Sequence, residues 1–293
     1  MNRRLLEYSA DISLLFISII WGSTFIIVKE AVNKIDPVVF LSYRFFFASL
    51  LLFPFLFLRK NKISLSSVYA GLVMGFVMFL VFYLQTVGLM YVSASKTGFL
   101  TGLYIVFVPL FSFLFLKKKP YPTSIIGVIL SIIGLYFISF KGKVNFGKGE
   151  FLILLNAIGI AIHIILTDFY SRKYDAMILT VIQITVTALL STFVSFATNK
   201  NIYIQLNNET IFAFILTGFF ATVLAFFIQT AMQKYTTPTK AAILFTLEPV
   251  SAAFFGYFIG KEILTFNQYV GALIIILAML TSEIGSAIIG VKK

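Results

Sequence analysis

The chain has 293 residues, of which 60% are hydrophobic and only 12% are charged, about half the charged share of a soluble domain. Its net charge of +12 would indicate nucleic acid as the partner of a soluble protein, but here the basic residues fall in short breaks between long apolar runs. Cysteine is absent, which excludes disulfides, thiolate chemistry and Cys-ligated metal sites. We expect an all-α integral membrane protein with no metal, no cofactor and no nucleic-acid partner.

Ten apolar runs follow one another, each near the ~20 residues that a helix needs to cross about 30 Å of hydrocarbon. A transmembrane β-barrel is excluded because its strands alternate apolar and polar residues, whereas residues 50–58 are apolar on every face. The predicted spans cover residues 11–29, 38–58, 68–90, 95–116, 122–140, 150–168, 177–197, 210–233, 239–259 and 266–289. The breaks between them are short, so no soluble domain is expected.

A short pattern in the third span recurs in the eighth. Residues 82–86 (FYLQT) match residues 226–230 (FFIQT) at an offset of 144. The same offset matches further polar residues, namely Tyr91 with Tyr235, Lys96 with Lys240 and Lys117 with Lys261. Gln, Tyr and Lys are scarce inside membrane spans, so these matches indicate an internal duplication.

The duplication divides the ten spans into five and five, over residues 1–143 and 144–293. Because five is odd, the two copies must enter the membrane from opposite sides. This predicts ten transmembrane helices arranged as two inverted five-helix repeats. Such repeats are associated with secondary transporters that hold the substrate near the midplane between the halves.

The distribution of basic residues predicts the orientation. Loops on the side of both termini hold 14 Lys and Arg, loops on the other side hold 8, and Arg44 within a span completes the 23. By the positive-inside rule both termini are cytoplasmic. We expect a monomeric, multi-pass protein of the cell (inner, plasma) membrane.

Three short stretches carry a family resemblance: residues 21–25 (WGSTF) in the first span, 247–250 (LEPV) in the ninth and 260–265 (GKEILT) after it. With the inverted repeat, they resemble the EamA family of the drug/metabolite transporter superfamily, including amino-acid exporters of the YddG type, over about residues 10–290. The resemblance implies a central cavity lined by spans one, three, four, six, eight and nine, and export of small metabolites. It leaves the substrate open among amino acids, amines, sugars and nucleotide conjugates.

Glu248 is the clearest functional candidate, because an ionisable group near the bilayer centre costs a few kcal/mol unless it faces protein or water. It directly precedes Pro249, whose missing N–H frees a carbonyl one turn earlier and bends the helix. The carboxylate could bind a substrate ammonium or carry a proton; alternatively it is neutral or paired and fixes helix packing. The offset of 144 places Pro249 opposite Ile105 and not Pro109, so the halves are expected to bend at different depths.

Arg44 lies about six residues into the second span, where it either snorkels outward or binds a carboxylate or a Glu side chain. His163, the single histidine, serves either proton coupling or hydrogen-bonded packing. Asp36 before the second span parallels Asp175 before the seventh, an alignment that sets Thr24 opposite His163.

Lys96 and Lys240 begin the fourth and ninth spans at matching positions, as symmetric gates or as anchors of the helix ends. Gln85 and Gln229 also match. Their amides could close hydrogen bonds across the repeat interface or touch substrate.

Trp21 is the sole tryptophan and lies well inside the first span, away from the interfacial belt where tryptophan collects. A cavity wall explains this position, because the indole offers a broad apolar face and one N–H donor. Thr24 follows on the same span and is included in the candidate cavity. Tyr83 and Tyr104 are weaker candidates of the same kind.

We expect a secondary transporter that exports small amphipathic metabolites, amino acids among them, by alternating access, with protons as a candidate coupling ion. A multidrug or other solute carrier, a channel and a membrane scaffold are the alternatives. An enzyme is not expected, because paired acidic motifs, HExxH and GxSxG are absent and one histidine without cysteine leaves little to catalyse with. The absence of a P-loop argues against ATP-driven pumping by this chain.

Overall fold

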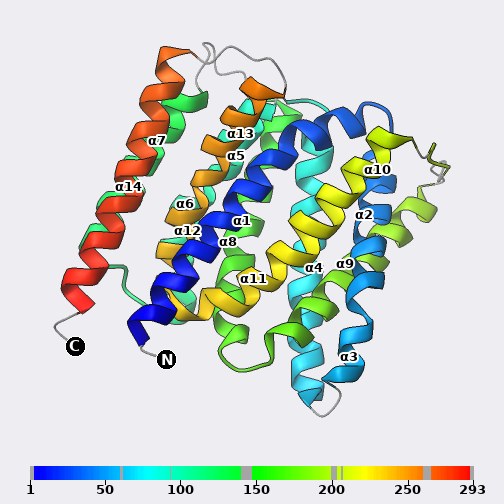
Figure 1. The fold of residues 1–293 in the computed structure, drawn as a ribbon, viewed down its shortest axis with the longest axis horizontal. Helices are drawn as coiled ribbons and strands as arrows, with labels where there is room; N and C mark the ends of the chain where they lie inside the picture. The colour runs from blue at the N-terminus through cyan, green and yellow to red at the C-terminus, as the bar shows by residue number, and fades with distance from the viewer. Residues whose placement is uncertain are drawn as a thin grey trace.

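The computed structural model describes residues 3–59, 62–92, 94–139, 147–198, 203–205, 207–259 and 265–290. These residues form helices and connecting turns and contain no strand (Figure 1). The helices are, in chain order, α1 (Arg3–Val32), α2 (Pro37–Leu52), α3 (Pro54–Leu58), α4 (Leu65–Gly88), α5 (Ala94–Gly102), α6 (Tyr104–Leu116), α7 (Pro122–Ser139), α8 (Lys148–Ser171), α9 (Ala176–Ala197), α10 (Asn208–Phe214), the π-helix η2 (Ile215–Leu224), α11 (Ala225–Met232), the 3₁₀ turn η3 (Gln233–Tyr235), α12 (Pro238–Phe245), α13 (Leu247–Phe258) and α14 (Phe266–Gly290).

Within the described ranges, seven helical segments are long and apolar enough to cross a membrane: Arg4–Val32, Pro37–Leu58, Leu65–Gly88, Lys148–Ser171, Ala176–Ala197, Asn208–Tyr235 and Pro238–Phe258. Three shorter apolar helices, Leu100–Leu116, Pro122–Phe137 and Phe266–Ser282, accompany them. Each segment overlaps one of the apolar runs predicted from the sequence. The prediction of an all-helical, multi-pass membrane protein is confirmed, whereas the division into inverted repeats stays a prediction.

The helices that follow Asp36 and Asp175 begin in the same way. The Asp36 carboxylate accepts the Val38 amide at 3.0 Å, and the Asp175 carboxylate accepts the Met177 amide at 3.0 Å. A carboxylate at this position satisfies an N–H that has no partner within the helix and lies at the positive end of the helix dipole. Helices α2 and α9 therefore start at the two positions that the sequence aligned.

The fourth and ninth predicted spans are interrupted near their middles. Helix α5 gives way to α6 at Leu103, whose amide bonds to Leu100 at 3.2 Å, and α12 gives way to α13 at Thr246, whose amide bonds to Ile243 at 3.1 Å. At the offset of 144, Leu103 aligns with Leu247, one residue from the second interruption. The expectation of bends at different depths is wrong, because Pro109 lies inside the continuous helix α6 and does not mark the break.

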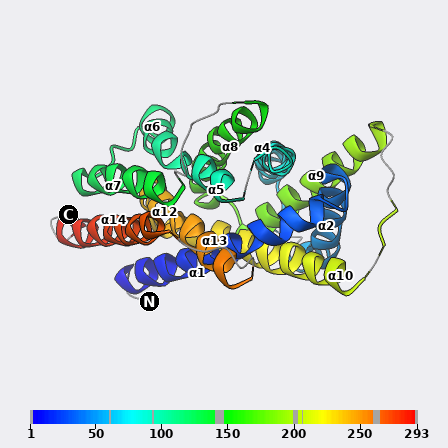
Figure 2. The ribbon, with the colours of Figure 1, turned by 90° about the horizontal axis from the view of Figure 1, so that it is seen from above.

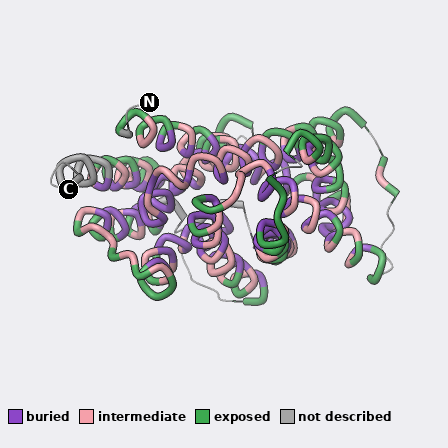
Figure 3. The backbone as a smooth tube through the Cα atoms, turned by 90° about the horizontal axis from the view of Figure 1, so that it is seen from below, coloured by how far each residue is buried: buried purple, intermediate pink, exposed green. Residues whose placement is uncertain are grey.

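Two helix pairs flank the molecule in Figures 1 and 2, α7 with α14 at one end and α2 with α9 at the other. Between them α1 packs against α13, and α4 and α8 pack against each other. Figure 3 shows exposed residues along the outer faces of the helices and buried residues toward the middle. Many exposed side chains are large and apolar, for example Phe57, Phe115, Phe193 and Leu273, as expected for surfaces that face lipid.

Candidate functional site

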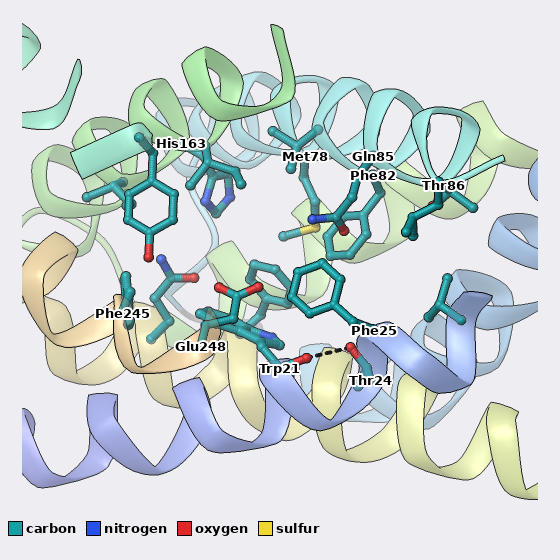
Figure 4. A pocket seen from close by; sticks show the side chains of 18 of the residues that line it. Trp21, Thr24, Phe25, Met78, Phe82, Gln85, Thr86, His163, Phe245 and Glu248 are labelled. Carbon is teal, nitrogen blue, oxygen red and sulfur yellow. Dashed lines mark hydrogen bonds between the residues drawn. The ribbon is translucent and has the colours of Figure 1, made fainter. Parts of the chain in front are cut away.

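A cavity of about 80 Å³ lies in the middle of the molecule, between α1, α4, α8 and the interrupted helices (Figure 4). It is lined by Trp21, Thr24, Phe25, Val28, Arg44, Met78, Val81, Phe82, Gln85, Thr86, Leu89, Tyr104, Ile160, His163, Ile164, Phe226, Gln229, Phe245 and Glu248. A water molecule needs roughly 10–15 Å³ on this measure. The cavity therefore has room for several waters or a small solute.

Most of the residues selected from the sequence line this cavity: Trp21, Thr24, Arg44, Gln85, Tyr104, His163, Gln229 and Glu248. Tyr83 lies outside the lining. Its neighbour Phe82 faces the cavity, and consecutive helical residues point about 100° apart, so Tyr83 points away from it. The Tyr83 ring packs on Phe79, with ring centres 5.7 Å apart. The lining comes from the six spans that the resemblance implies, and Arg44 adds the second span.

Glu248 enters the cavity from the first turn of α13, directly after the break at Thr246. Figure 4 shows its carboxylate and the His163 ring pointing into the same space from opposite sides. Backbone N–H groups at the start of a helix favour a negative charge. In the described part of the chain no cation forms an ion pair with Glu248. The carboxylate therefore lies at the start of α13 and faces the cavity without a cationic partner among the described residues.

Arg44 is buried, with 3% of its surface exposed, and faces the cavity from α2. Its Nε donates to the Thr222 hydroxyl at 2.9 Å, and its guanidinium lies 4.6 Å from the centre of the Phe82 ring. The snorkelling alternative is wrong, because Thr222 and Phe82 hold the side chain inside the molecule. No carboxylate in the described ranges pairs with this cation.

The π-helix η2 lies behind the cavity wall, and none of its residues is part of the lining. The Ala225 amide donates to the carbonyls of Phe220 and Thr222, and the Ala221 carbonyl accepts the Trp21 indole N–H at 2.9 Å. The next residue of η2, Thr222, is the one that holds Arg44. One widened turn thus positions both the single tryptophan and the buried cation, consistent with the frequent occurrence of π-bulges at functional sites.

His163 is fixed by a short chain of polar groups. Its Nε2 lies 2.9 Å from Gln183 Oε1, and Gln183 Nε2 donates to the Thr230 hydroxyl at 3.3 Å. With Gln183 Oε1 as the acceptor, Nε2 carries the proton, and Nδ1 of the ring is the atom left to accept one. Both readings of His163 meet here, since the residue is hydrogen-bonded and also lines the cavity.

Two further polar groups are buried in the cavity wall with unused hydrogen-bonding capacity. The hydroxyl of Tyr104, a residue only 1% exposed, has no hydrogen-bond partner among the described residues, and the same holds for Gln229 Oε1. Gln229 Nε2 donates to Gln233 at 3.2 Å, and no hydrogen bond in the described part joins Gln229 to Gln85. A buried polar group left unpaired costs about 1–3 kcal/mol, so these atoms are suited to a bound solute.

Of the residues predicted for gating or charge pairing, Arg44 lines the cavity, and Lys240 and Pro249 do not. Lys240 Nζ forms a buried ion pair with Asp11 at 2.7 Å, which ties α12 to α1. Pro249 follows Glu248 outside the lining and lies against Gly98 of α5. The side chain of Lys96 lies outside the described residues, as do residues 260–264 of the third motif.

Sequence reasoning missed two buried acids, which pair with bases outside the cavity, and several residues of the cavity wall. Asp11 and Asp168 are acids inside or at the edge of apolar runs, and the rule that selected Glu248 would have selected them. Phe245 packs at the cavity without any distinguishing sequence signal, because phenylalanine is abundant throughout the chain. Phe82 and Phe226 begin the repeated pattern, but of the identical positions of that pattern only the Gln pair was selected for the cavity.

The fold and the site define a multi-pass membrane protein with a central cavity that is apolar on most sides and contains a few inward-facing polar groups. The EamA-like transporter family matches residues 8–140 and again residues 147–282, so the chain belongs to this family. An uncharacterized transporter of Archaeoglobus fulgidus is 36% identical over 92% of this chain and 84% of its own length.

The uncharacterized transporter YoaV of Bacillus subtilis is 24% identical over 90% of this chain and 93% of its own length. A protein of known crystal structure shares the fold with a TM-score of 0.78 at 15% identity, covering 94% of this chain and 96% of that one. The role of the chain is therefore that of a membrane transporter, with a small-molecule substrate and the lipid bilayer as its surroundings.

Proposed function

We propose that the chain is a secondary-active transporter that exports small amphipathic metabolites, amino acids or related solutes, by alternating access through the central cavity. The observation that supports this proposal is the presence of two opposite charges in the lining of one cavity. Glu248 and Arg44 both line it, and neither pairs with another charged residue in the described ranges. A buried charge without a partner is costly. This favours a solute that brings a positive group to Glu248 and a negative group to Arg44.

Alternating access requires two halves that exchange conformations, and we assign them to residues 1–143 and 144–293, inverted relative to each other. The two family matches, one in each half, support this assignment. So do the matching helix starts at Asp36 and Asp175 and the nearly matching breaks at Leu103 and Thr246. Ten membrane-spanning helices follow from this division.

The contacts at the two ends of α1 indicate where such a motion acts. Near its beginning α1 is tied to α12 by the Asp11–Lys240 ion pair, and near its end Lys29 donates to the backbone carbonyls of Leu89 and Val92. We assign Lys240 to a gate on the side of both termini and Lys96 to the opposite gate. We assign Pro249 to the hinge between α12 and α13.

The composition of the lining indicates the substrate class. Glu248 would bind an ammonium group, Arg44 a carboxylate, and Tyr104 and Gln229 would add hydrogen bonds. The aromatic faces of Trp21, Phe25, Phe82, Phe226 and Phe245 would cover an apolar side chain. The same aromatic surface is compatible with a broad range of hydrophobic amines, so a multidrug carrier is the second candidate.

We further propose protons as the coupling ion, taken up by Glu248 or by His163 Nδ1, and a monomer in the cell membrane with both termini cytoplasmic. Nucleic acid has no part in this function. The excess of basic residues on the terminal side supports the orientation.

Substrate counterflow in proteoliposomes tests the function. Liposomes preloaded with single amino acids or amines should accumulate the matching labelled compound with saturation, whereas a channel would show no saturation and a scaffold no flux. Glu248→Gln should lower exchange of an amine-bearing substrate about tenfold or more, as expected for a lost charge-assisted hydrogen bond. Glu209→Gln, which removes an exposed acid, is the matched control and should stay within about twofold.

Coupling is tested separately by imposing a pH gradient. We expect His163→Ala or Glu248→Gln to abolish uptake driven by the gradient. Since Glu248→Gln is also expected to lower exchange, His163→Ala is the variant that should retain exchange. Unchanged gradient-driven uptake in both variants would reject proton coupling by these residues.

A further inference from the structure

A second, larger cavity lies on the outside of the molecule between α6 and α8, which are neighbours in Figure 2. It measures about 400 Å³ and shares no lining residue with the central cavity. Its walls are Phe111, Phe115 and Leu116 of α6 and Ile162, Ile165, Leu166, Phe169 and Tyr170 of α8. We call it the α6–α8 groove. Its surface is apolar and aromatic, with the Tyr170 hydroxyl as its one polar side-chain group.

Both walls of the groove run directly into basic residues. Lys117, Lys118 and Lys119 follow α6, and Arg172 and Lys173 follow α8. The carboxylate of Asp168, which is 1% exposed, accepts Lys118 Nζ at 2.5 Å and Arg172 Nη2 at 2.8 Å. Asp168 lies about one turn beyond Ile165 and next to Phe169, so this ion-pair cluster adjoins the end of the groove. We call this the closed end of the groove. Five bases and one acid leave a net charge of +4 at the closed end.

The turn after α6 presents the remaining lysines. Lys117 has φ 53°, and the Lys118 amide bonds back to Ser112 at 3.2 Å, which reverses the chain in a left-handed turn. Lys118 reaches Asp168 from this turn, while Lys117 and Lys119 are exposed and pair with no carboxylate of the described residues. Lys173 Nζ lies 3.7 Å from the centre of the Phe169 ring, which is part of the groove wall.

We propose that the α6–α8 groove binds an acyl chain of an anionic phospholipid, whose phosphate lies among Lys117, Lys119 and Lys173. Basic residues alone at helix ends would be explained by the positive-inside rule and by the helix dipole. Here they adjoin an apolar groove that is open to the bilayer, and a basic pocket between transmembrane helices is suited to a lipid headgroup. The site is separate from the solute cavity and does not depend on the proposed substrate.

The probe is thermal unfolding of the purified protein in a neutral detergent with added lipid. We expect dioleoylphosphatidylglycerol to raise Tm more than the same amount of dioleoylphosphatidylcholine. Glycerol 1-phosphate, a phosphate without acyl chains, should leave Tm unchanged. Equal shifts from the two lipids, or an equal shift from glycerol 1-phosphate, would overturn the proposal.

The headgroup contact is tested by the triple variant Lys117→Gln, Lys119→Gln, Lys173→Gln, which changes exposed side chains only. It should lose more than half of the extra shift given by phosphatidylglycerol. The triple variant Arg59→Gln, Lys62→Gln, Lys234→Gln removes the same charge from the same end of the molecule and should keep the shift. Equal losses in the two variants would show that general positive charge is sufficient, and would overturn the site.

The acyl-chain contact is tested with all charges intact. Ile162→Trp fills the groove, and Phe115→Gln makes its wall polar at a side chain that is 69% exposed, where the cost to folding is small. Both should lose most of the phosphatidylglycerol shift. If one does not fold, the other decides, and a folded variant that keeps the full shift would contradict the occupied groove.

Discussion

Gly22 brings the backbone of α1 against α13 at the edge of the cavity. A Cβ at this position would lie 2.4 Å from the Glu248 carbonyl oxygen and 2.9 Å from the Ala252 backbone nitrogen, distances that no side chain can accommodate. Small residues allow this kind of close approach between membrane helices. Because Gly22 touches the residue before Pro249, the contact also fixes the height at which the Glu248 carboxylate enters the cavity.

We predict that Gly22→Ala destabilises the protein by about 1–3 kcal/mol, the usual cost of overpacking, despite the better helix propensity of alanine. Thermal unfolding measures this cost. Gly98→Ala is the matched control, since its Cβ would meet Pro249 only at 3.8 Å, an ordinary contact. Equal stability of the two variants would contradict the close approach of α1 and α13.

At the residue scale, the sequence predicted what is unusual and missed what depends on neighbours. Glu248 and Trp21 could be selected because an acid or a tryptophan deep in an apolar run needs a reason to be there. The depth of Arg44 in its span said nothing of Thr222, which lies on another helix and turns the guanidinium inward. Tyr83 and Phe82 are adjacent, and only the rotation of α4 decides which one faces the cavity.

Helices α1 and α12 are joined by the Asp11–Lys240 ion pair, whose side chains are 6% and 11% exposed. Removing one partner of such a pair leaves a buried charge and costs about 3–5 kcal/mol, whereas removing both costs less than the sum. We predict that Asp11→Asn and Lys240→Gln each lower Tm and that the double variant is less destabilised than additivity requires. A double-mutant cycle, built from the original protein, the two single variants and the double variant, should give a coupling energy of about 1–3 kcal/mol. Additive effects would show that the pair does not join the helices.

Asp175 caps the start of helix α9 and lies outside the membrane-spanning segments. Burial raises the pKa of this carboxyl, but the hydrogen bond from Lys62, the amides of Met177 and Ile178 and the charge of Arg59 outweigh burial and hold the pKa below its ordinary value of 3.8. A lowered pKa stabilises the folded protein above the ordinary value, and the stabilisation is lost as the pH falls through the folded value.

We predict that Asp175→Asn, which keeps a capping oxygen but loses the charge, is less stable than the original protein at neutral pH by about 0.5–1 kcal/mol. The difference should shrink as the pH falls below the ordinary value of 3.8 and the original carboxylate becomes protonated. Melting curves at several pH values measure it. A difference that stays constant with pH would mean that the charge of Asp175 contributes nothing.

At the element scale, apolar runs and polar breaks were sufficient to place the helices, because each must cover the hydrocarbon and satisfy its own backbone. The interruptions were harder to predict. Pro249 marked the interruption at Thr246, but no proline marks the one at Leu103. The π-helix η2 forms where Trp21 and Arg44 bind it from other helices. Such features depend on contacts between helices that periodicity in a single run does not contain.

Across the whole molecule, the proposed equivalence of the halves accounts for the arrangement in Figure 2, where α2 pairs with α9 and α7 with α14. Under the five-span division these are the second and seventh spans and the fifth and tenth spans, so each pair joins equivalent members. The offset of 144 residues was visible in the sequence because scarce polar residues recur. The cavity was not, because it depends on how the two halves meet.

The account depends on a cavity that lies between inverted halves and is reached in turn from each face of the membrane. The chain has no cysteine, so single cysteines can be introduced and labelled with a membrane-impermeant thiol reagent. Lys62→Cys and Gln205→Cys mark the two faces and should label from opposite sides only. We predict that Thr86→Cys in the cavity wall is labelled from both sides, and that saturating substrate slows both reactions. Labelling of Thr86→Cys from one side only, or of both markers from the same side, would contradict the account.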